Sequence, residues 1–125
     1  MIRVYIAFGL VLFAATARAE PAGPGHYVDS SGPLNSGECE NFSQWYELCT
    51  REIALGHSIT NFSSSLQGDR ECGNWSECRL TTNAPRRKCV QFRMQGHDEN
   101  CGAGSIGHPN NGTGVSEMIL QYDVE

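Results

Sequence analysis

One short stretch of the chain concentrates groups that could ligate a cation or move a proton. Residues 96–100 read Gly-His-Asp-Glu-Asn, so an imidazole, two carboxylates and an amide follow one another directly. Such groups could bind Ca²⁺ or a transition metal, or act as an acid–base pair. The same residue types form ordinary turns, because Gly, Asp and Asn tolerate unusual backbone angles. We therefore expect a turn that binds no metal. The candidate ligand-binding residues are Gln95, His97, Asp98, Glu99, Asn100 and His108.

The recognised signatures of catalysis are absent from the sequence. It contains no G-x-S-x-G nucleophile elbow, no H-E-x-x-H zinc motif, no phosphate-binding loop and no dinucleotide fingerprint. A small hydrolase that uses His97 with Asp98 or Glu99 therefore stands as an alternative, behind a non-enzymatic function. No catalytic residue and no cofactor are predicted.

The cysteines indicate a disulfide framework, because their number is even and small exported domains use disulfides to supplement a thin core. They are Cys39, Cys49, Cys72, Cys78, Cys89 and Cys101. A zinc site is disfavoured, since no C-x2-C or C-x4-C pair occurs. About three disulfides are expected. A predicted hairpin would place Cys78 opposite Cys89, so we expect a bridge between them, and the other pairings remain open.

The first 19 residues predict a secretory signal peptide. Arg3 precedes an apolar run over residues 4–15, and Ala17-Arg18-Ala19 offers the cleavage pattern. The run is too short to span ~30 Å of hydrocarbon, so we expect no membrane insertion after cleavage and a secreted or periplasmic location. The remaining chain carries fourteen acidic residues and seven basic ones. This negative charge disfavours nucleic acid as a partner.

The chain beyond the signal divides by composition. Residues 20–38 are rich in Pro, Gly and Ser and predict a flexible leader, whereas residues 39–125 predict a single disulfide-rich β domain. Apolar residues alternate over 90–94 and 118–124, which is typical of half-buried strands. The alternation over 53–66 contains a one-residue slip, which indicates a β-bulge. The expected fold is all-β, a small antiparallel β-sandwich or flattened barrel.

Two tryptophans lie close to cysteines in the sequence. Trp45 and Trp75 could form a binding platform, but we expect them to pack in the core. The motif Trp-Ser-Glu-Cys at 75–78, followed by Arg-Arg-Lys-Cys at 86–89, resembles a fragment of a thrombospondin type 1 repeat. The chain lacks that family's Cys-Gly pair after Cys78 and its repeated tryptophans, so the resemblance is local and assigns no family.

These observations favour an exported, non-enzymatic binding module. Its polar loops, at residues 95–100 and 102–114, would contact a carbohydrate or protein ligand from a rigid β scaffold. The first alternative is a secreted inhibitor or effector that acts on a protein target. The second alternative is the small hydrolase described above.

Overall fold

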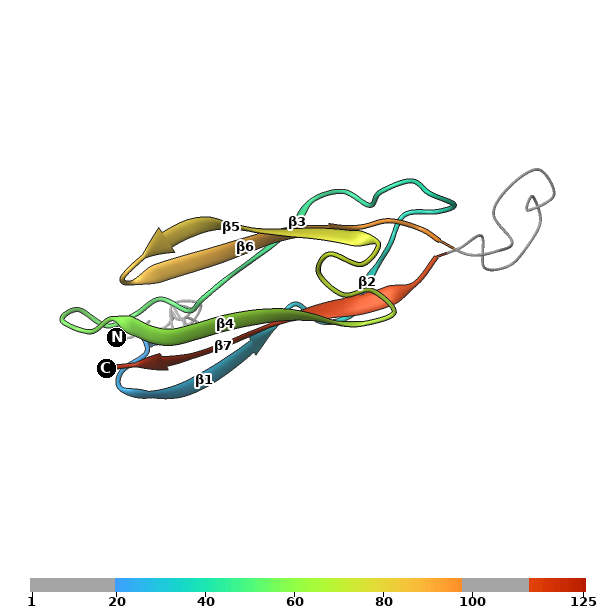
Figure 1. The fold of residues 1–125 in the computed structure, drawn as a ribbon. Coiled ribbons are helices and arrows are strands. Elements are labelled where there is room, and N and C mark those ends of the chain that lie inside the picture. Colours follow the sequence, from blue (N-terminus) through green and yellow to red (C-terminus); the bar gives the residue numbers. More distant parts are fainter. Residues whose placement is uncertain (1–19, 98–112) are drawn as a thin grey trace, which may run out of the picture.

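The computed structural model describes residues 20–97 and 113–125 (Figure 1). These residues form strands and no helix, arranged as two antiparallel sheets, which confirms the predicted all-β class. No described segment is a helix long and apolar enough to cross a membrane. The strands are β1 (Gly25–Ser30), β2 (Leu34–Asn35), β3 (Tyr46–Cys49), β4 (Ile59–Gly68), β5 (Ser76–Ala84), β6 (Arg87–Met94) and β7 (Val115–Val124).

Each sheet is built around one of the strands with predicted alternation. β7 pairs with β1 and β2 along one edge and with β4 along the other, whereas β6 pairs with β3 and β5. Every second residue of β7 from Ser116 to Val124 is buried, and on β6 the alternating Val90, Phe92 and Met94 are buried. The two sheets lie as two layers (Figure 1), and buried residues of both form one core cluster.

Residues 20–38, predicted to be a flexible leader, instead take part in the fold. β1 pairs with β7 over its whole length of six residues. Ahead of β1, the buried Ala22 donates its backbone N–H to the carbonyl of Glu52 at 2.8 Å. Composition underestimates how ordered this segment is, because adding a strand to a sheet relies on backbone hydrogen bonds and needs few apolar side chains. The folded unit therefore includes residues well before Cys39.

The slip predicted in the alternation over 53–66 is present. The pairing of β4 with β7 shifts register between Thr60 and Ser63, as a β-bulge does. Asn61, inside the bulge, has a φ of 52°, and its amide donates to the carboxylate of Asp123 at 2.8 Å. The strand begins later than the pattern suggested, at Ile59.

The β5–β6 hairpin forms with a register different from the predicted one. Its turn lies at residues 85–86, two residues later than expected. Cys89 consequently pairs with Thr82, and a register shift between Leu80 and Thr82 pairs Cys78 with Phe92. The expected Cys78–Cys89 bridge is therefore wrong.

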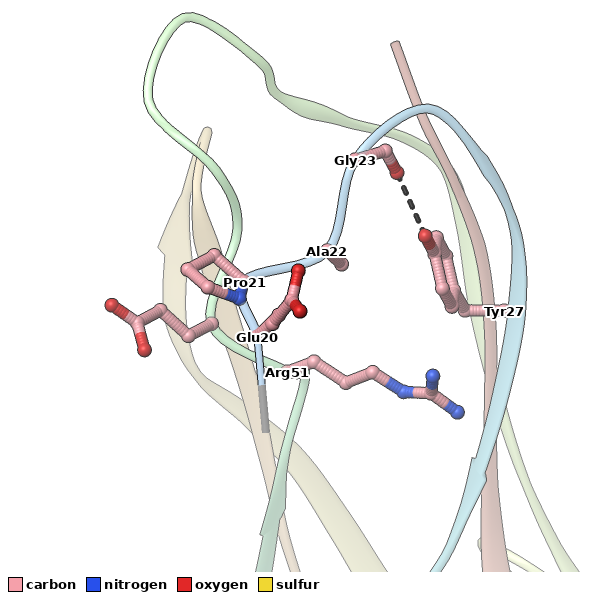
Figure 2. A pocket seen from close by; sticks show the side chains of 7 residues that line it. Glu20, Pro21, Ala22, Gly23, Tyr27 and Arg51 are labelled. Carbon is pink, nitrogen blue, oxygen red and sulfur yellow. Dashed lines mark hydrogen bonds between the residues drawn. The ribbon is translucent and has the colours of Figure 1, made fainter. Parts of the chain in front are cut away.

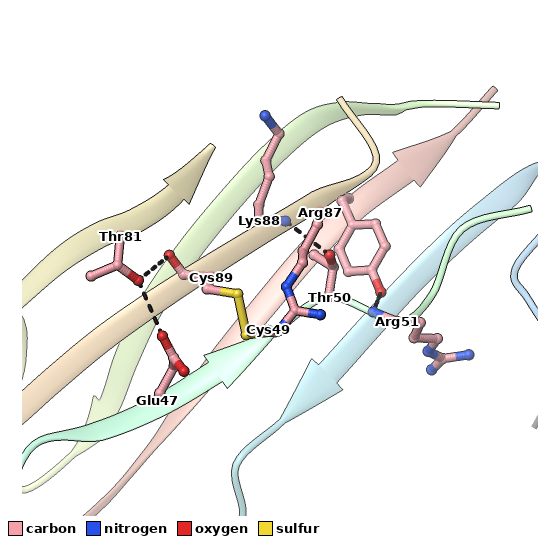
Figure 3. The surroundings of a disulfide bond; sticks show 9 residues. Glu47, Cys49, Thr50, Arg51, Thr81, Arg87, Lys88 and Cys89 are labelled. Atoms are coloured by element: carbon pink, nitrogen blue, oxygen red, sulfur yellow. Dashed lines mark hydrogen bonds between the residues drawn. A yellow bond between two sulfur atoms is a disulfide. The ribbon is translucent and has the colours of Figure 1, made fainter. Parts of the chain in front are cut away.

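Two disulfides connect the described residues. Cys49–Cys89 joins directly opposite residues of β3 and β6 (Figure 3), and Cys72–Cys78 closes a short loop that includes the first residues of β5. Both agree with an oxidising compartment. The third expected bridge would use Cys101, which lies outside the described residues, so it stays a prediction.

A buried tyrosine connects β7 to the neighbouring segments. The hydroxyl of Tyr122 donates to Asp29 and accepts a hydrogen bond from the Arg51 backbone N–H at 3.1 Å. Asp29 also pairs with the Arg51 guanidinium at 2.7 Å. Burial, together with the hydrogen bond to Asp29, raises the pKa of Tyr122 to about 12.

This pKa predicts an alkaline stability loss that depends on one residue. A raised pKa in the folded state means that Tyr122 stabilises the fold below about pH 10, and that this contribution is lost as the pH rises toward about 12. Tyr122→Phe should cost about 1 kcal/mol at pH 8 through the lost hydrogen bonds. The difference in the free energy of unfolding between this variant and the wild type should become smaller when urea unfolding is repeated at higher pH. A difference that stays constant up to pH 12 would contradict the assignment.

Candidate functional site

Trp75 and His97 form a stacked pair where the β5–β6 ladder ends. Their ring centroids lie 3.7 Å apart with the planes inclined by 9°. Trp75 directly precedes β5, and the Gln95 backbone N–H donates to its carbonyl at 2.9 Å. Trp75 is 41% exposed, so the expectation that it fills the core is wrong. The pair joins a predicted ligand-binding residue, His97, to an aromatic ring at the surface.

A short disulfide loop holds Trp75 in an unusual backbone conformation. Its φ is 56°, a left-handed value that costs a bulky residue roughly 1–2 kcal/mol. The Cys72–Cys78 bridge closes the loop, and the Gly73 N–H donates to the Ser76 carbonyl at 3.2 Å inside it. The covalent closure and the internal hydrogen bond therefore keep the tryptophan in one position at the surface.

Gln95, the other described residue of the predicted site, is engaged within the protein. Its side-chain amide donates to the Glu40 carbonyl at 2.7 Å, and its backbone carbonyl accepts from the buried Arg70 at 2.7 Å. The next residue, Gly96, donates to the Asn41 carbonyl at 2.9 Å. Gln95 therefore holds the end of β6 in place. Its backbone hydrogen bond to the Trp75 carbonyl also fixes the backbone of the stacked pair.

The rest of the predicted polar cluster lies outside the described residues, namely Asp98, Glu99, Asn100 and His108. The residues that flank this part of the chain are fixed. Gly114 exchanges two hydrogen bonds with Ser36, at 2.8 and 2.9 Å. Gly37 donates to the Met94 carbonyl at 3.0 Å, close to His97 in the sequence. One segment after β2 therefore packs against both flanks.

The outer face of the three-stranded sheet carries a row of alternating rings and guanidinium groups. Arg93 lies 4.1 Å from the ring centroid of Phe42 and 4.7 Å from that of Trp45. Arg79 lies 4.0 Å from the Trp45 centroid. We call these four residues the arginine–aromatic stack. Each contact has cation–π geometry, worth about 0.5–1 kcal/mol at an exposed site.

Polar partners fix the two arginines of this stack. Arg93 forms an ion pair with Glu77 across the β5–β6 ladder at 2.9 Å. Arg79 donates twice to the side-chain oxygen of Gln91, at 2.8 and 3.1 Å. In the described part of the chain, Arg79 has no carboxylate partner within ion-pair distance. Its guanidinium group is held in place by Trp45 and Gln91.

A metal site finds little support in residues 20–97 and 113–125. One set of potential ligands there is compact, with Glu47, Cys49 and Cys89 offering atoms within 4.8 Å of one another. The two sulfur atoms are bonded to each other, so neither is a thiolate ligand. This arrangement is a structural disulfide beside a surface carboxylate.

A separate hollow of about 500 Å³ lies beside the first described residues (Figure 2). Its wall includes Ala22, Tyr27 and Arg51, and the Tyr27 hydroxyl donates to the Gly23 carbonyl at 2.8 Å. Arg51 lies over the Tyr27 ring, 4.8 Å from its centroid. This contact and the ion pair to Asp29 hold the half-exposed Arg51 side chain in place.

Comparisons with protein families, curated proteins and solved structures found no match for this chain. Its function is therefore inferred from the geometry of its own residues. Sequence reasoning missed the arginine–aromatic stack. The strand alternation could have indicated its two arginines, since Arg79 and Arg93 both occupy solvent-facing positions of their strands.

Proposed function

We propose that this protein is an exported binding module that recognises a protein ligand on the outer face of its three-stranded sheet. The recognition surface consists of the arginine–aromatic stack and the Trp75–His97 pair. The observation that carries the proposal is Trp75, a half-exposed tryptophan held at a positive φ by a dedicated disulfide loop. Residues with a strained backbone persist only where the surrounding structure holds them firmly, and they are often found at ligand contacts.

The residue types of this surface favour a protein over a carbohydrate. Tryptophan and arginine are the side chains most enriched among the hot spots of protein interfaces. A sugar would need a free ring face, but two guanidinium groups already contact Trp45. Among the described Trp, Tyr and Phe rings, Trp75 is the most exposed, and His97 stacks against it. A carbohydrate ligand is therefore the second candidate, centred on Trp75 alone.

The proposed scaffold is a small β-sandwich that presents this surface without rearrangement. β3 and β6 are joined by a disulfide, and β5 pairs with β6 over most of its length. A surface built on paired strands loses little conformational entropy on binding, which raises its affinity. The export signal and the secreted or periplasmic location belong to the same proposal.

The test is ligand capture that depends on single side chains. The secreted form would be immobilised and exposed to the extracellular and envelope proteins of its source, and separately to a glycan array. We expect a protein ligand whose binding weakens by about 30-fold in Trp75→Ala and Arg79→Ala, the effect of a 2 kcal/mol hot spot. Affinities would be measured by surface plasmon resonance.

A matched control lies on the other sheet. Gln121, an exposed residue of β7, should tolerate alanine with unchanged binding. Equal losses in Gln121→Ala and Trp75→Ala would contradict the proposed surface. Saturable binding to a glycan, lost in Trp75→Ala but retained in Arg79→Ala, would replace the protein ligand by a carbohydrate.

A further inference from the structure

A second hollow lies at the turn end of the β5–β6 hairpin, away from the Trp75–His97 pair. It measures about 430 Å³, and three arginines contribute to its wall: Arg51, Arg86 and Arg87. Glu52 is the acidic residue of the same wall. This concentration of guanidinium groups is unusual in a chain whose formal net charge is −5. The hollow adjoins the one in Figure 2, since both include Arg51 and Glu52.

The backbone that carries these arginines is fixed by contacts outside the hairpin. The carbonyl of Pro85, in the turn, accepts a hydrogen bond from the Ile59 N–H at 2.7 Å. Arg86 donates from one Nη to the Ile53 carbonyl. Arg87 approaches the disulfide, with an Nη 3.4 Å from the sulfur of Cys49 (Figure 3). Two of the arginines are therefore positioned by the fold before any ligand arrives.

The charges of the three arginines are unequally compensated. Arg51 is paired with Asp29, and the hydrogen bond from that pair raises the pKa of Arg51. Across the described ranges, neither Arg86 nor Arg87 has a carboxylate within ion-pair distance. Each guanidinium group carries five N–H donors in a planar fork, and the structure uses one donor of each. Most of these donors have no partner among the described residues and can bind an anion.

We propose that this hollow is a binding site for an oxyanion, such as the carboxylate, sulfate or phosphate group of a small ligand. Arg86 and Arg87 would donate forked hydrogen bonds to its oxygens, the geometry for which guanidinium groups are suited. The adjoining hollow, with Ala22 and Tyr27 in its wall, would accommodate an apolar part of the ligand. Glu52 opposes the binding of negative charge in this hollow, so the site should favour a ligand with a single anionic group.

The test uses phenyl phosphate, benzoate, inorganic phosphate and sulfate as probes, titrated into the secreted form at constant ionic strength. Binding would be followed by the arginine Nε–H signals in ¹H–¹⁵N spectra. We expect saturable shifts of Arg86 and Arg87, with tighter binding of the two aromatic probes. Arg87→Gln should weaken binding about tenfold, the loss of one charge-assisted pair of hydrogen bonds.

Lys88→Gln is the matched control, because it removes the same charge next to Arg87. The Lys88 ammonium donates to the side chain of Asn83 and is absent from the wall of the hollow. The Lys88→Gln variant should bind the probes as tightly as the wild type does. Equal losses in Arg87→Gln and Lys88→Gln would show general electrostatic attraction and overturn the site. Shifts that never saturate, or that spare Arg86 and Arg87, would also overturn it.

Discussion

Replacing both Cys49 and Cys89 by alanine should destabilise the protein by about 4 kcal/mol, the largest effect that we expect from any pair of substitutions. This disulfide connects residues 40 positions apart, so its loss frees a long loop in the unfolded chain. Replacing Cys72 and Cys78 should cost about 2 kcal/mol, because they are only six positions apart. Urea unfolding followed by circular dichroism would measure both values.

The comparison between the two pairs is its own control, since each variant loses one bridge and two sulfur atoms. The order of the two losses tests whether unfolded-chain entropy dominates. An equal loss, or a larger loss from the Cys72–Cys78 pair, would show that unfolded-chain entropy does not dominate. The short bridge has a different expected role: its removal should release Trp75 from its positive φ and weaken ligand binding more than it weakens the fold.

Gly96→Val should destabilise the protein by about 3 kcal/mol, the upper range for forcing atoms into a packed site. A β-carbon at Gly96 would lie 2.6 Å from the Cys39 nitrogen and 2.7 Å from the Glu38 carbonyl carbon. Both contacts are to backbone, which cannot rotate away as a side chain can. The segment after β2 would have to move, and its hydrogen bonds with the end of β6 would break. Thermal and urea unfolding would measure the loss.

Gly23→Ala is the control for this substitution. A β-carbon at Gly23 meets no atom within 4 Å, and the residue has no positive φ. Its stability should stay within about 0.5 kcal/mol of the wild type. A Gly96→Val variant as stable as Gly23→Ala would show that the end of β6 is not clamped. Because Gly96 adjoins His97, the variant should also disturb the stacked pair.

The alternating strands were the predictable part of the fold. From Val90 to Met94 in β6 and from Met118 to Val124 in β7, every second side chain contributes to the core, so the sequence pattern follows burial directly. β1 could not be predicted in the same way, because Tyr27 is its main contribution to the core and its pairing relies on backbone groups. The predicted register of the hairpin was wrong for a related reason. Residues 81–84 have turn-forming composition but continue β5, since the turn forms at Pro85.

The candidate site was predictable only in part. His97 stood out through its polar neighbours, yet its described partner is Trp75, 22 positions earlier in the chain and brought close by the β5–β6 pairing. The arginine–aromatic stack depends on the register of β5 and β6 and on the segment before β3, which no local pattern contains. The choice between core and surface for Trp75 was decided by the Cys72–Cys78 loop, and that connectivity was open in the sequence.

The most direct test of the central claim is a map of the bound ligand on the protein surface. Tryptophan indole and arginine Nε–H groups give separate signals in ¹H–¹⁵N spectra, so side chains of the proposed surface can be observed directly. On addition of the captured ligand, we expect shifts of Trp45, Trp75, Arg79 and Arg93, while the amide of Gln121 on the other sheet stays unchanged. Shifts confined to β1, β4 and β7, with both tryptophan signals unmoved, would contradict this expectation.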